Sequence, residues 1–414
     1  MTETTLDPRT ATMTTFDQST SSAGSGLTPR SWLLALVPLL LLAGVMTVIF
    51  ATDGGIGERT APPIEALSIQ RVRLPEPGLM EVHVTNDGAD AVTIAQVTVD
   101  DAYWQFSMSP AGELDRLSSA TVSIPYPWVK DEAHLITLVS STGVVFPVDV
   151  PVAIESPSAD RGTVARFGLI GLYVGIVPVV LGLLWYPFLR RLGRRGLNFV
   201  LALTIGLLVF LVVDMFGAAQ ETASTVATAL NATVLVPILA LMTAALLVVV
   251  GRSLRERQGG ASPLALSYQI ATGIGLHNLG EGLAIGAAFA LGEAALGVFL
   301  IAGFTLHNVT EGIGIASPLT RDRPPLRHFA LLAVVAGGPA ILGTWIGAFV
   351  YSPFWTTIFL AIGVGAILQV IVEVGRLIAR TQARHQEPAL TWTTLSGVTA
   401  GVAVMYLTAL LVTA

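Results

Sequence analysis

Two copies of one short polar motif lie in apolar stretches of the chain. Residues 276–282 read LHNLGEG, and residues 306–312 read LHNVTEG. Within each copy the His and the Glu are four residues apart, so on an α-helix they share one face. Ionisable side chains within membrane-spanning segments are costly and for that reason mark functional sites. The residues of the two copies that can bind a metal ion are His277, Asn278, Glu281, His307, Asn308 and Glu311.

The spacing between the copies suits two antiparallel helices joined by a tight turn. A turn near Gly292-Glu293 places each His about 15 residues, or roughly 22 Å of helix, from the turn. Both motifs then lie at a similar depth in the membrane. Two imidazoles and two carboxylates that meet at one depth form a site suited to a borderline divalent cation such as zinc. The alternative is that polar groups on neighbouring helices satisfy these side chains.

The composition is that of a polytopic membrane protein. Of the 414 residues, 53% are hydrophobic and only 12% are charged, whereas soluble proteins contain about 25% charged residues. The chain has no cysteine, which excludes thiolate metal ligands and disulfides. Nothing in the charge pattern indicates a nucleic-acid partner. The expected partners are divalent metal ions and the lipid bilayer, and the sequence leaves a homodimer open.

Four regions follow one another along the chain. Residues 1–30 are rich in Ser and Thr, which predicts a disordered tail. Residues 31–51 are predicted to be a membrane anchor, because their apolar run is long enough to span a bilayer and too long for a signal peptide. Residues 52–160 contain alternating apolar and polar positions between turn signals, which predicts a β-sandwich. Residues 161–414 are predicted to form an eight-helix bundle, so the expected fold class is an all-α polytopic membrane protein with an added β-sandwich.

Eight apolar runs define the expected spans of the last region. They cover residues 164–189, 197–218, 226–250, 263–290, 294–317, 327–350, 354–378 and 391–412. Arginines gather in alternate connections, around residues 190–195, 252–257, 321–327 and 376–384, and the other connections contain no Lys or Arg. Because basic loops stay on the cytoplasmic side of the cell membrane, the tail is predicted to be cytoplasmic. The β-sandwich and the C-terminus are predicted to be extracytoplasmic.

Two further acidic residues lie within the expected spans. Asp214 lies toward the outer end of the second span, and Glu373 toward the inner end of the seventh. Each is a candidate for a cation pathway that leads to or from the motifs, or for a carboxylate that reaches the membrane interface. Gly282 and Gly286 are four residues apart, a spacing that allows close helix packing.

The eight spans and the paired motifs on the fourth and fifth of them resemble the ZIP (Zrt/Irt-like) family of divalent metal transporters. The resemblance covers residues 164–412, and the motifs look most like those of the bacterial GufA-like branch. It implies transport of zinc toward the cytoplasm, with Fe²⁺, Mn²⁺ and Cd²⁺ as alternative ions. It also implies a binuclear site. Its first metal would be bound by His277, Glu281, His307 and Glu311, and its second by Asn278, Asn308 and the shared carboxylates.

The sequence departs from the family pattern at three positions. Gly280 and Thr310 replace the motif prolines, which puts the helix kinks of the family in doubt. Gly338, before Pro339, stands where the family has a Glu that binds the second metal, so we expect one tightly bound ion. The chain is not expected to be an enzyme. An intramembrane zinc-dependent hydrolase and a membrane metal sensor are the alternative functions.

Overall fold

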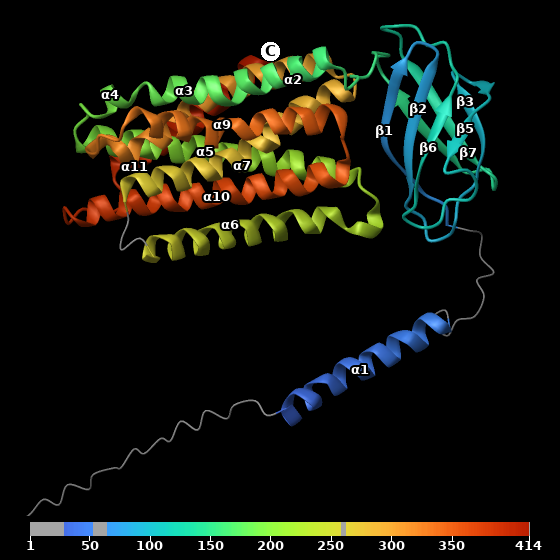
Figure 1. Ribbon diagram of the computed structural model, residues 1–414, viewed down its shortest axis with the longest axis horizontal. Helices are drawn as coiled ribbons and strands as arrows, with labels where there is room; N and C mark the ends of the chain where they lie inside the picture. Colours follow the sequence, from blue (N-terminus) through green and yellow to red (C-terminus); the bar gives the residue numbers. More distant parts are fainter. Residues whose placement is uncertain (1–28, 53–63, 258–261, 414) are drawn as a thin grey trace, which may run out of the picture. The chain divides into compact units, whose positions relative to one another are not determined.

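The computed structural model describes residues 29–52, 64–257 and 262–413 (Figure 1). The predicted tail, residues 1–30, therefore lies almost wholly outside the described residues. The chain divides into two units, Met1–Pro62 and Pro63–Ala414. In the first unit, helix α1 (Pro29–Ala51) covers the segment for which an anchor is predicted. The second unit contains two β-sheets and a bundle of long helices.

The strands form two antiparallel four-stranded sheets, ordered β1-β2-β6-β5 and β4-β3-β7-β8. The strands are β1 (Leu67–Glu76), β2 (Leu79–Asn86), β3 (Ile94–Val99), β4 (Ala102–Trp104), β5 (Ser107–Ser109), β6 (Ser119–Ile124), β7 (His134–Ser140) and β8 (Val145–Val150). Alternate residues of β2 and β7, such as Val82 and Ile136, are fully buried in one shared apolar core. This alternation is what a sheet with one buried face requires, and the sheets pack as a sandwich.

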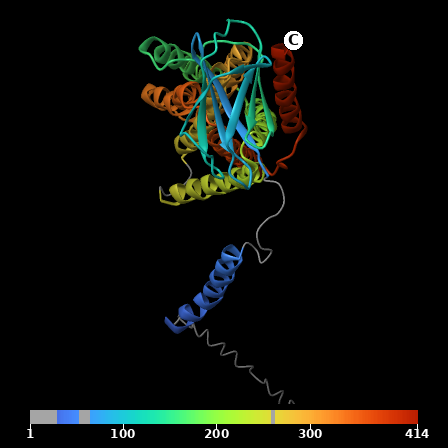
Figure 2. The same ribbon diagram turned by 90° about the vertical axis from the view of Figure 1, so that its right-hand side faces the viewer.

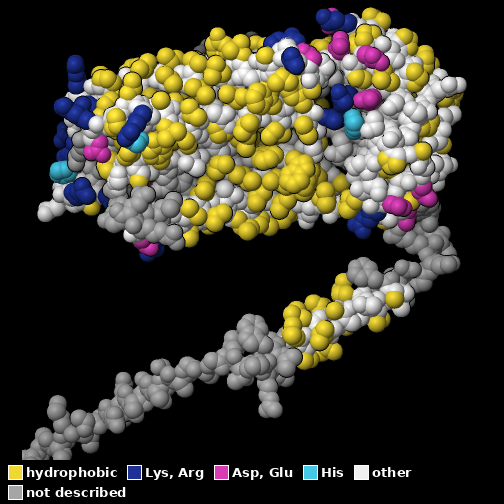
Figure 3. All heavy atoms as spheres, in the orientation of Figure 1, with side chains coloured by type: hydrophobic (Ala, Val, Ile, Leu, Met, Phe, Trp, Pro, Cys, Tyr) yellow, Lys and Arg dark blue, Asp and Glu magenta, His cyan; other side chains and the backbone are white. Residues whose placement is uncertain are grey.

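Helices, most of them long, make up most of the rest of the second unit (Figures 1 and 2). They are α2 (Arg161–Gly171), the π-helical turn η2 (Leu172–Ile176), α3 (Val177–Leu183), α4 (Tyr186–Leu189), α5 (Arg194–Ser224), α6 (Ala232–Arg257), α7 (Pro263–Ala290), α8 (Ala294–Ala316), α9 (Leu326–Phe349), α10 (Pro353–Ala383) and α11 (Trp392–Thr413). Apolar side chains cover the flank of the bundle, and Lys and Arg side chains gather at one end (Figure 3). This surface suits a protein embedded in a bilayer.

Within the described ranges, seven helical segments are long and apolar enough to cross a membrane. They correspond to seven of the eight expected spans. Helix α7 has 28 residues, enough to span, yet it is not among the seven. Its glycines and the polar motif lower its hydropathy, and the motif residues His277, Asn278 and Glu281 are buried by neighbouring helices. An interior helix need not be apolar on every side, because protein rather than lipid surrounds it.

Glycines bring α7 and α9 into backbone contact. A Cβ atom added at Gly282 would lie 2.2 Å from the carbonyl oxygen of Ala340, and one at Gly286 would lie 2.3 Å from that of Thr344. Gly343 of α9 makes the reciprocal contact with α7, where an added Cβ would lie 2.2 Å from the carbonyl oxygen of Leu279. The close-packing face predicted for Gly282 and Gly286 is therefore confirmed, and its partner is α9.

The β-sandwich contacts the connection between α5 and α6. Ser68 Oγ donates a hydrogen bond to the Thr225 carbonyl oxygen at 2.8 Å. Asp87 Oδ1 accepts hydrogen bonds from Thr228 Oγ1 at 3.0 Å and from the Ala229 backbone N–H at 3.2 Å. This connection contains no Lys or Arg, so the sandwich lies beside one of the non-basic connections.

One added methyl group tests the α7–α9 contact. Gly282→Ala should lower the free energy of unfolding by about 1–3 kcal/mol, the usual cost of overpacking. The matched control is Gly217→Ala in α5, where an added Cβ meets no heavy atom within 4 Å and should raise stability by up to about 1 kcal/mol. Thermal unfolding in detergent compares the two. A melting temperature for Gly282→Ala at or above that of the control would contradict the close packing.

Candidate metal site

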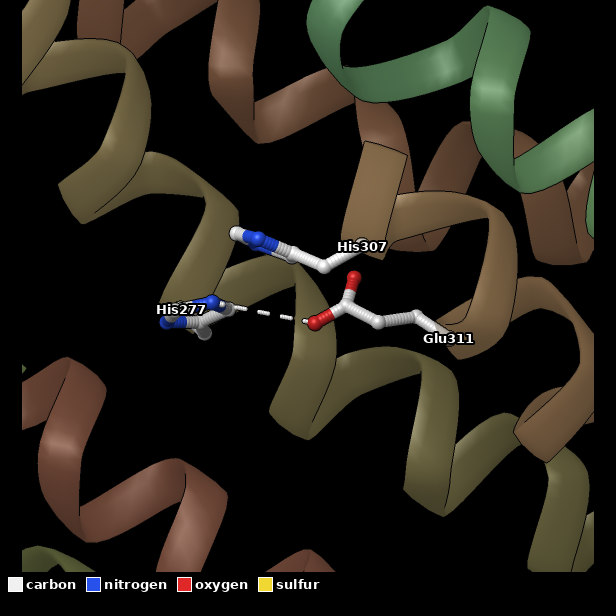
Figure 4. Close-up of side chains that lie close together, drawn as sticks. All are labelled: His277, His307 and Glu311. Carbon is white, nitrogen blue, oxygen red and sulfur yellow. Dashed lines mark ion pairs between the residues drawn. The ribbon is translucent and has the colours of Figure 1, made fainter. Parts of the chain in front are cut away.

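The two motifs meet inside the bundle. His277 and Glu281 of α7 and His307 and Glu311 of α8 are each at most 5% exposed. Glu281 Oε1 lies 2.9 Å from His277 Nε2 and 2.5 Å from His307 Nε2, and Glu311 Oε1 lies 3.7 Å from His277 Nε2. Figure 4 shows His277, His307 and Glu311 pointing toward one another. The four predicted ligands of the first metal are thus brought together.

The donor atoms of this cluster are arranged to bind a cation. His277, His307 and Glu311 each offer one ligand atom within 4.8 Å of the others. Among the described residues, neither carboxylate oxygen of Glu311 and neither ring nitrogen of His277 makes a hydrogen bond of good geometry, although the Asn278 side chain lies beside Glu311. Buried polar atoms without such bonds are rare in folded proteins, and a cation at the cluster would satisfy them.

The two motif asparagines connect the cluster to neighbouring helices. Asn278 Nδ2 donates a hydrogen bond to the Ala336 carbonyl oxygen of α9 at 3.0 Å. Asn308 Nδ2 donates to the Val174 carbonyl oxygen and to Glu281 Oε2, each at 3.0 Å. The structure therefore gives both asparagines a positioning role. Their side-chain oxygens make no hydrogen bond within the described part of the chain, so these oxygens stay available to a cation.

Prolines on neighbouring helices expose the backbone near the cluster. Pro178 has no N–H, so Val174 four residues earlier lacks its helical hydrogen-bond donor, and the helix there widens to the π-turn η2. The Val174 carbonyl oxygen accepts a hydrogen bond from Asn308 Nδ2. On α9, Pro339 has the same effect on Val335, whose carbonyl oxygen lies against Gly275. The motifs themselves lack prolines. The prolines that remove backbone hydrogen bonds near the cluster belong instead to α3 and α9, which the sequence did not indicate.

Asp214 and Glu373 line separate cavities. Asp214 is exposed, and it lines a cavity of about 250 Å³ together with His307 and Thr408. Glu373 is 2% exposed, and its Oε1 lies 2.9 Å from Arg376 Nη1. It lines a cavity of about 230 Å³ together with Asn198. Asp214 therefore shares a cavity with a motif residue, and Glu373 borders a second cavity near the basic end of α10.

Gly338 does not lie where a ligand of the cluster would be expected. Among the described side chains, a Cβ atom at Gly338 would contact only Val334 Cγ1, at 3.7 Å, and Val334 is 52% exposed. The α9 atom that bonds a motif side chain is instead the Ala336 carbonyl oxygen, which accepts a hydrogen bond from Asn278 Nδ2. This placement does not favour a carboxylate at 338 as a ligand of a second metal.

A His and a Glu of β2 also lie close together. Glu81 Oε2 lies 4.0 Å from His83 Nε2 and 3.5 Å from Arg73 Nη1. Burial, with Arg71 and Arg73 nearby, lowers the pKa of His83 to about 4. Because the same arginines repel a metal ion, this pair is a poor site for capturing cations.

The comparison with protein families agrees with the geometry of the cluster. Residues 252–409 match the family model described as ZIP Zinc transporter. The match includes both motifs and covers well under half of the chain. The comparison with curated proteins found no match. With the seven apolar helices, the family match supports a multi-pass membrane protein that transports divalent metal ions.

Removing the Asn308 amide tests its role at the cluster. Asn308→Ala should weaken zinc binding about ten- to hundredfold, the usual effect of losing a group that orients a metal ligand. Thr310→Ala is the matched control, because within the described part of the chain the Thr310 hydroxyl donates a hydrogen bond to the His307 carbonyl oxygen of its own helix and not to a side chain of the cluster. Competition with a zinc chelator measures both affinities. Wild-type affinity in Asn308→Ala would show that the amide neither orients nor binds.

Proposed function

We propose that this protein carries divalent transition-metal ions, zinc first among them, across the cell membrane toward the cytoplasm. The observation that carries the proposal is the buried meeting of two imidazoles and two carboxylates from adjacent helices. The family match over residues 252–409 supports it. The motif pattern supports placing the chain near the bacterial GufA-like branch.

The charge of the cluster suits a divalent ion in a low-dielectric setting. Glu281 and Glu311 supply two negative charges and the imidazoles bind as neutral ligands, so a bound Zn²⁺ leaves no net charge to bury. His277, Glu281, His307 and Glu311 are the proposed ligands. Asn278 and Asn308 orient the carboxylates and offer their side-chain oxygens to a second, weaker ion. Fe²⁺, Mn²⁺ and Cd²⁺ fit the same donor atoms.

Asp214 and Glu373 are proposed to lie along the ion pathway. The cavity that Asp214 lines reaches His307, so a carboxylate stands where an ion would approach the cluster. The cavity at Glu373 opens among Arg380 and Arg384, near the basic end of the bundle. An ion that leaves the cluster toward this end would replace Arg376 as the partner of Glu373.

The arginine distribution supports the proposed orientation. Residues 1–30 form the cytoplasmic tail, residues 31–51 the anchor, and residues 52–160 the extracytoplasmic β-sandwich. Residues 161–414 form the transport bundle, in which α7 is the fourth span and brings the number of spans to eight. The basic connections are cytoplasmic and the C-terminus is extracytoplasmic. A homodimer is compatible with this arrangement.

A zinc-dependent hydrolase and a metal sensor are the competing functions. Both would use the same ligands. A hydrolase needs an open coordination position on the metal for water. In the proposed site both carboxylates are metal ligands, so neither is left to act as the general base of a hydrolase. Vesicles containing the purified protein separate the functions, because only a transporter moves zinc into the lumen.

Loss of one imidazole should abolish transport. His277→Ala or His307→Ala removes a ligand of the proposed site, so we expect zinc uptake into vesicles that contain equal amounts of folded protein to fall to background. His328→Ala is the matched control, since His328 bonds Tyr268 instead of the cluster. Uptake equal to wild type by either motif variant, at equal protein content, would disprove the site assignment.

The number of bound ions follows from the carboxylates. Only Glu281 and Glu311 supply full negative charge within the cluster, so two divalent ions would leave two positive charges buried. We expect elemental analysis of the purified protein to give one tightly bound zinc ion per chain. Two tightly bound ions would require a further carboxylate, with Asp214 the first to examine.

A further inference from the structure

We propose that the groove between α3–α4 and the start of α9 binds an anionic phospholipid. The groove has a volume of about 410 Å³. Its lining is almost entirely apolar, and it includes Leu184, Pro187, Leu326, Phe329 and Ala330. Leu184 is 67% exposed and Leu326 is 82% exposed, so the groove is open to its surroundings.

The wall of the groove is built from aromatic side chains. The rings of Tyr186 and Phe329 lie with their centroids 4.9 Å apart. The Tyr186 hydroxyl donates a hydrogen bond to the Asp322 carbonyl oxygen, which ties α4 to the segment before α9. Tyrosine and tryptophan side chains prefer the membrane interface, and Trp185 is 49% exposed beside this groove. The groove therefore lies where acyl chains meet headgroups.

One arginine contacts the wall of the groove, and three more lie in the two chain segments that border it. The Arg190 guanidinium lies over the Tyr186 ring, 5.7 Å from its centroid, and so is held at the groove wall. Arg191, Arg323 and Arg327 are exposed in the same two segments, residues 190–191 and 322–327. Asp322 is the one acidic residue in these segments, so the net charge there is positive.

The two parts of the groove match the two parts of one ligand. An acyl chain fits the apolar lining, and guanidinium groups bind phosphate through paired N–H donors. A zwitterionic headgroup has no net charge, whereas the headgroup of an anionic lipid is net negative, so the arginines favour the anionic lipid. The groove also borders α3, whose Gly182 packs against Gly312 beside the motif residue Glu311. A lipid there would support α3 from the side opposite the metal site.

Lipid competition tests the proposal with full-length protein. The protein in nonionic detergent is mixed with equal amounts of phosphatidylglycerol and phosphatidylcholine, and native mass spectrometry counts each bound lipid. We expect wild type to retain phosphatidylglycerol preferentially. Arg190→Gln should reduce this preference about fivefold, the effect of one arginine near an anionic lipid. The control is Arg195→Gln, which removes an exposed arginine of α5. Arg190 is held over the ring of the lining residue Tyr186, whereas Arg195 belongs to neither segment that borders the groove, so the control should behave as wild type.

A second pair of variants tests the apolar part. Ala330→Phe should fill the groove and remove the retained lipid, whereas Ala245→Phe, at an exposed position of α6, should not. If the wild-type protein retained equal amounts of the two lipids, the proposal would be wrong whatever the variants showed. Equal retention of phosphatidylglycerol by the two Phe variants would place the lipid elsewhere and would also overturn it.

Discussion

The carboxylate of Glu281 contacts side chains from both motif helices, and the rest of the site depends on it. One oxygen lies 2.9 Å from His277 Nε2 and 2.5 Å from His307 Nε2, and the other accepts a hydrogen bond from Asn308. A carboxylate that is 2% exposed is tolerated only where its charge is met by donors or by a cation. Both imidazoles must therefore lie at the same level along the bundle as Glu281. This requirement fixes how far α7 can slide along α8.

Backbone features of the surrounding helices maintain this arrangement. Pro178 and Pro339 lack the N–H that a helix would supply, which leaves carbonyl oxygens near the motifs without their usual donors. Asn308 uses one of these oxygens to fix its amide against Glu281. Glycines allow α7 to lie against the backbone of α9, as at Gly282 and Ala340. A polar cluster inside an apolar bundle is thus supported by residues that themselves carry no charge.

Much of this arrangement was predictable from the sequence. The repeated spacing of His and Glu placed His277, Glu281, His307 and Glu311 together, because helix periodicity fixes a face without tertiary information. Strand β2 was predictable from its alternation, whereas Arg71, Arg73 and Pro75 interrupt the apolar pattern of β1 (Leu67–Glu76), so its bounds could not be predicted. The positioning role of Asn278 and Asn308 was not predictable, since their acceptors belong to distant segments. The outward direction of Gly338 was missed because it depends on how α9 is rotated in the bundle.

The proposed site requires one metal ion to be bound by imidazoles from both motifs. X-ray absorption spectroscopy of the zinc-loaded protein measures this directly, because imidazole rings give multiple-scattering features and Zn–N distances of about 2.0–2.1 Å. We predict two imidazoles per zinc ion in the wild-type protein and one in His307→Ala, with oxygen ligands completing the shell. A wild-type spectrum with one imidazole or none would show that the two motifs do not share an ion, and would contradict this account of the site.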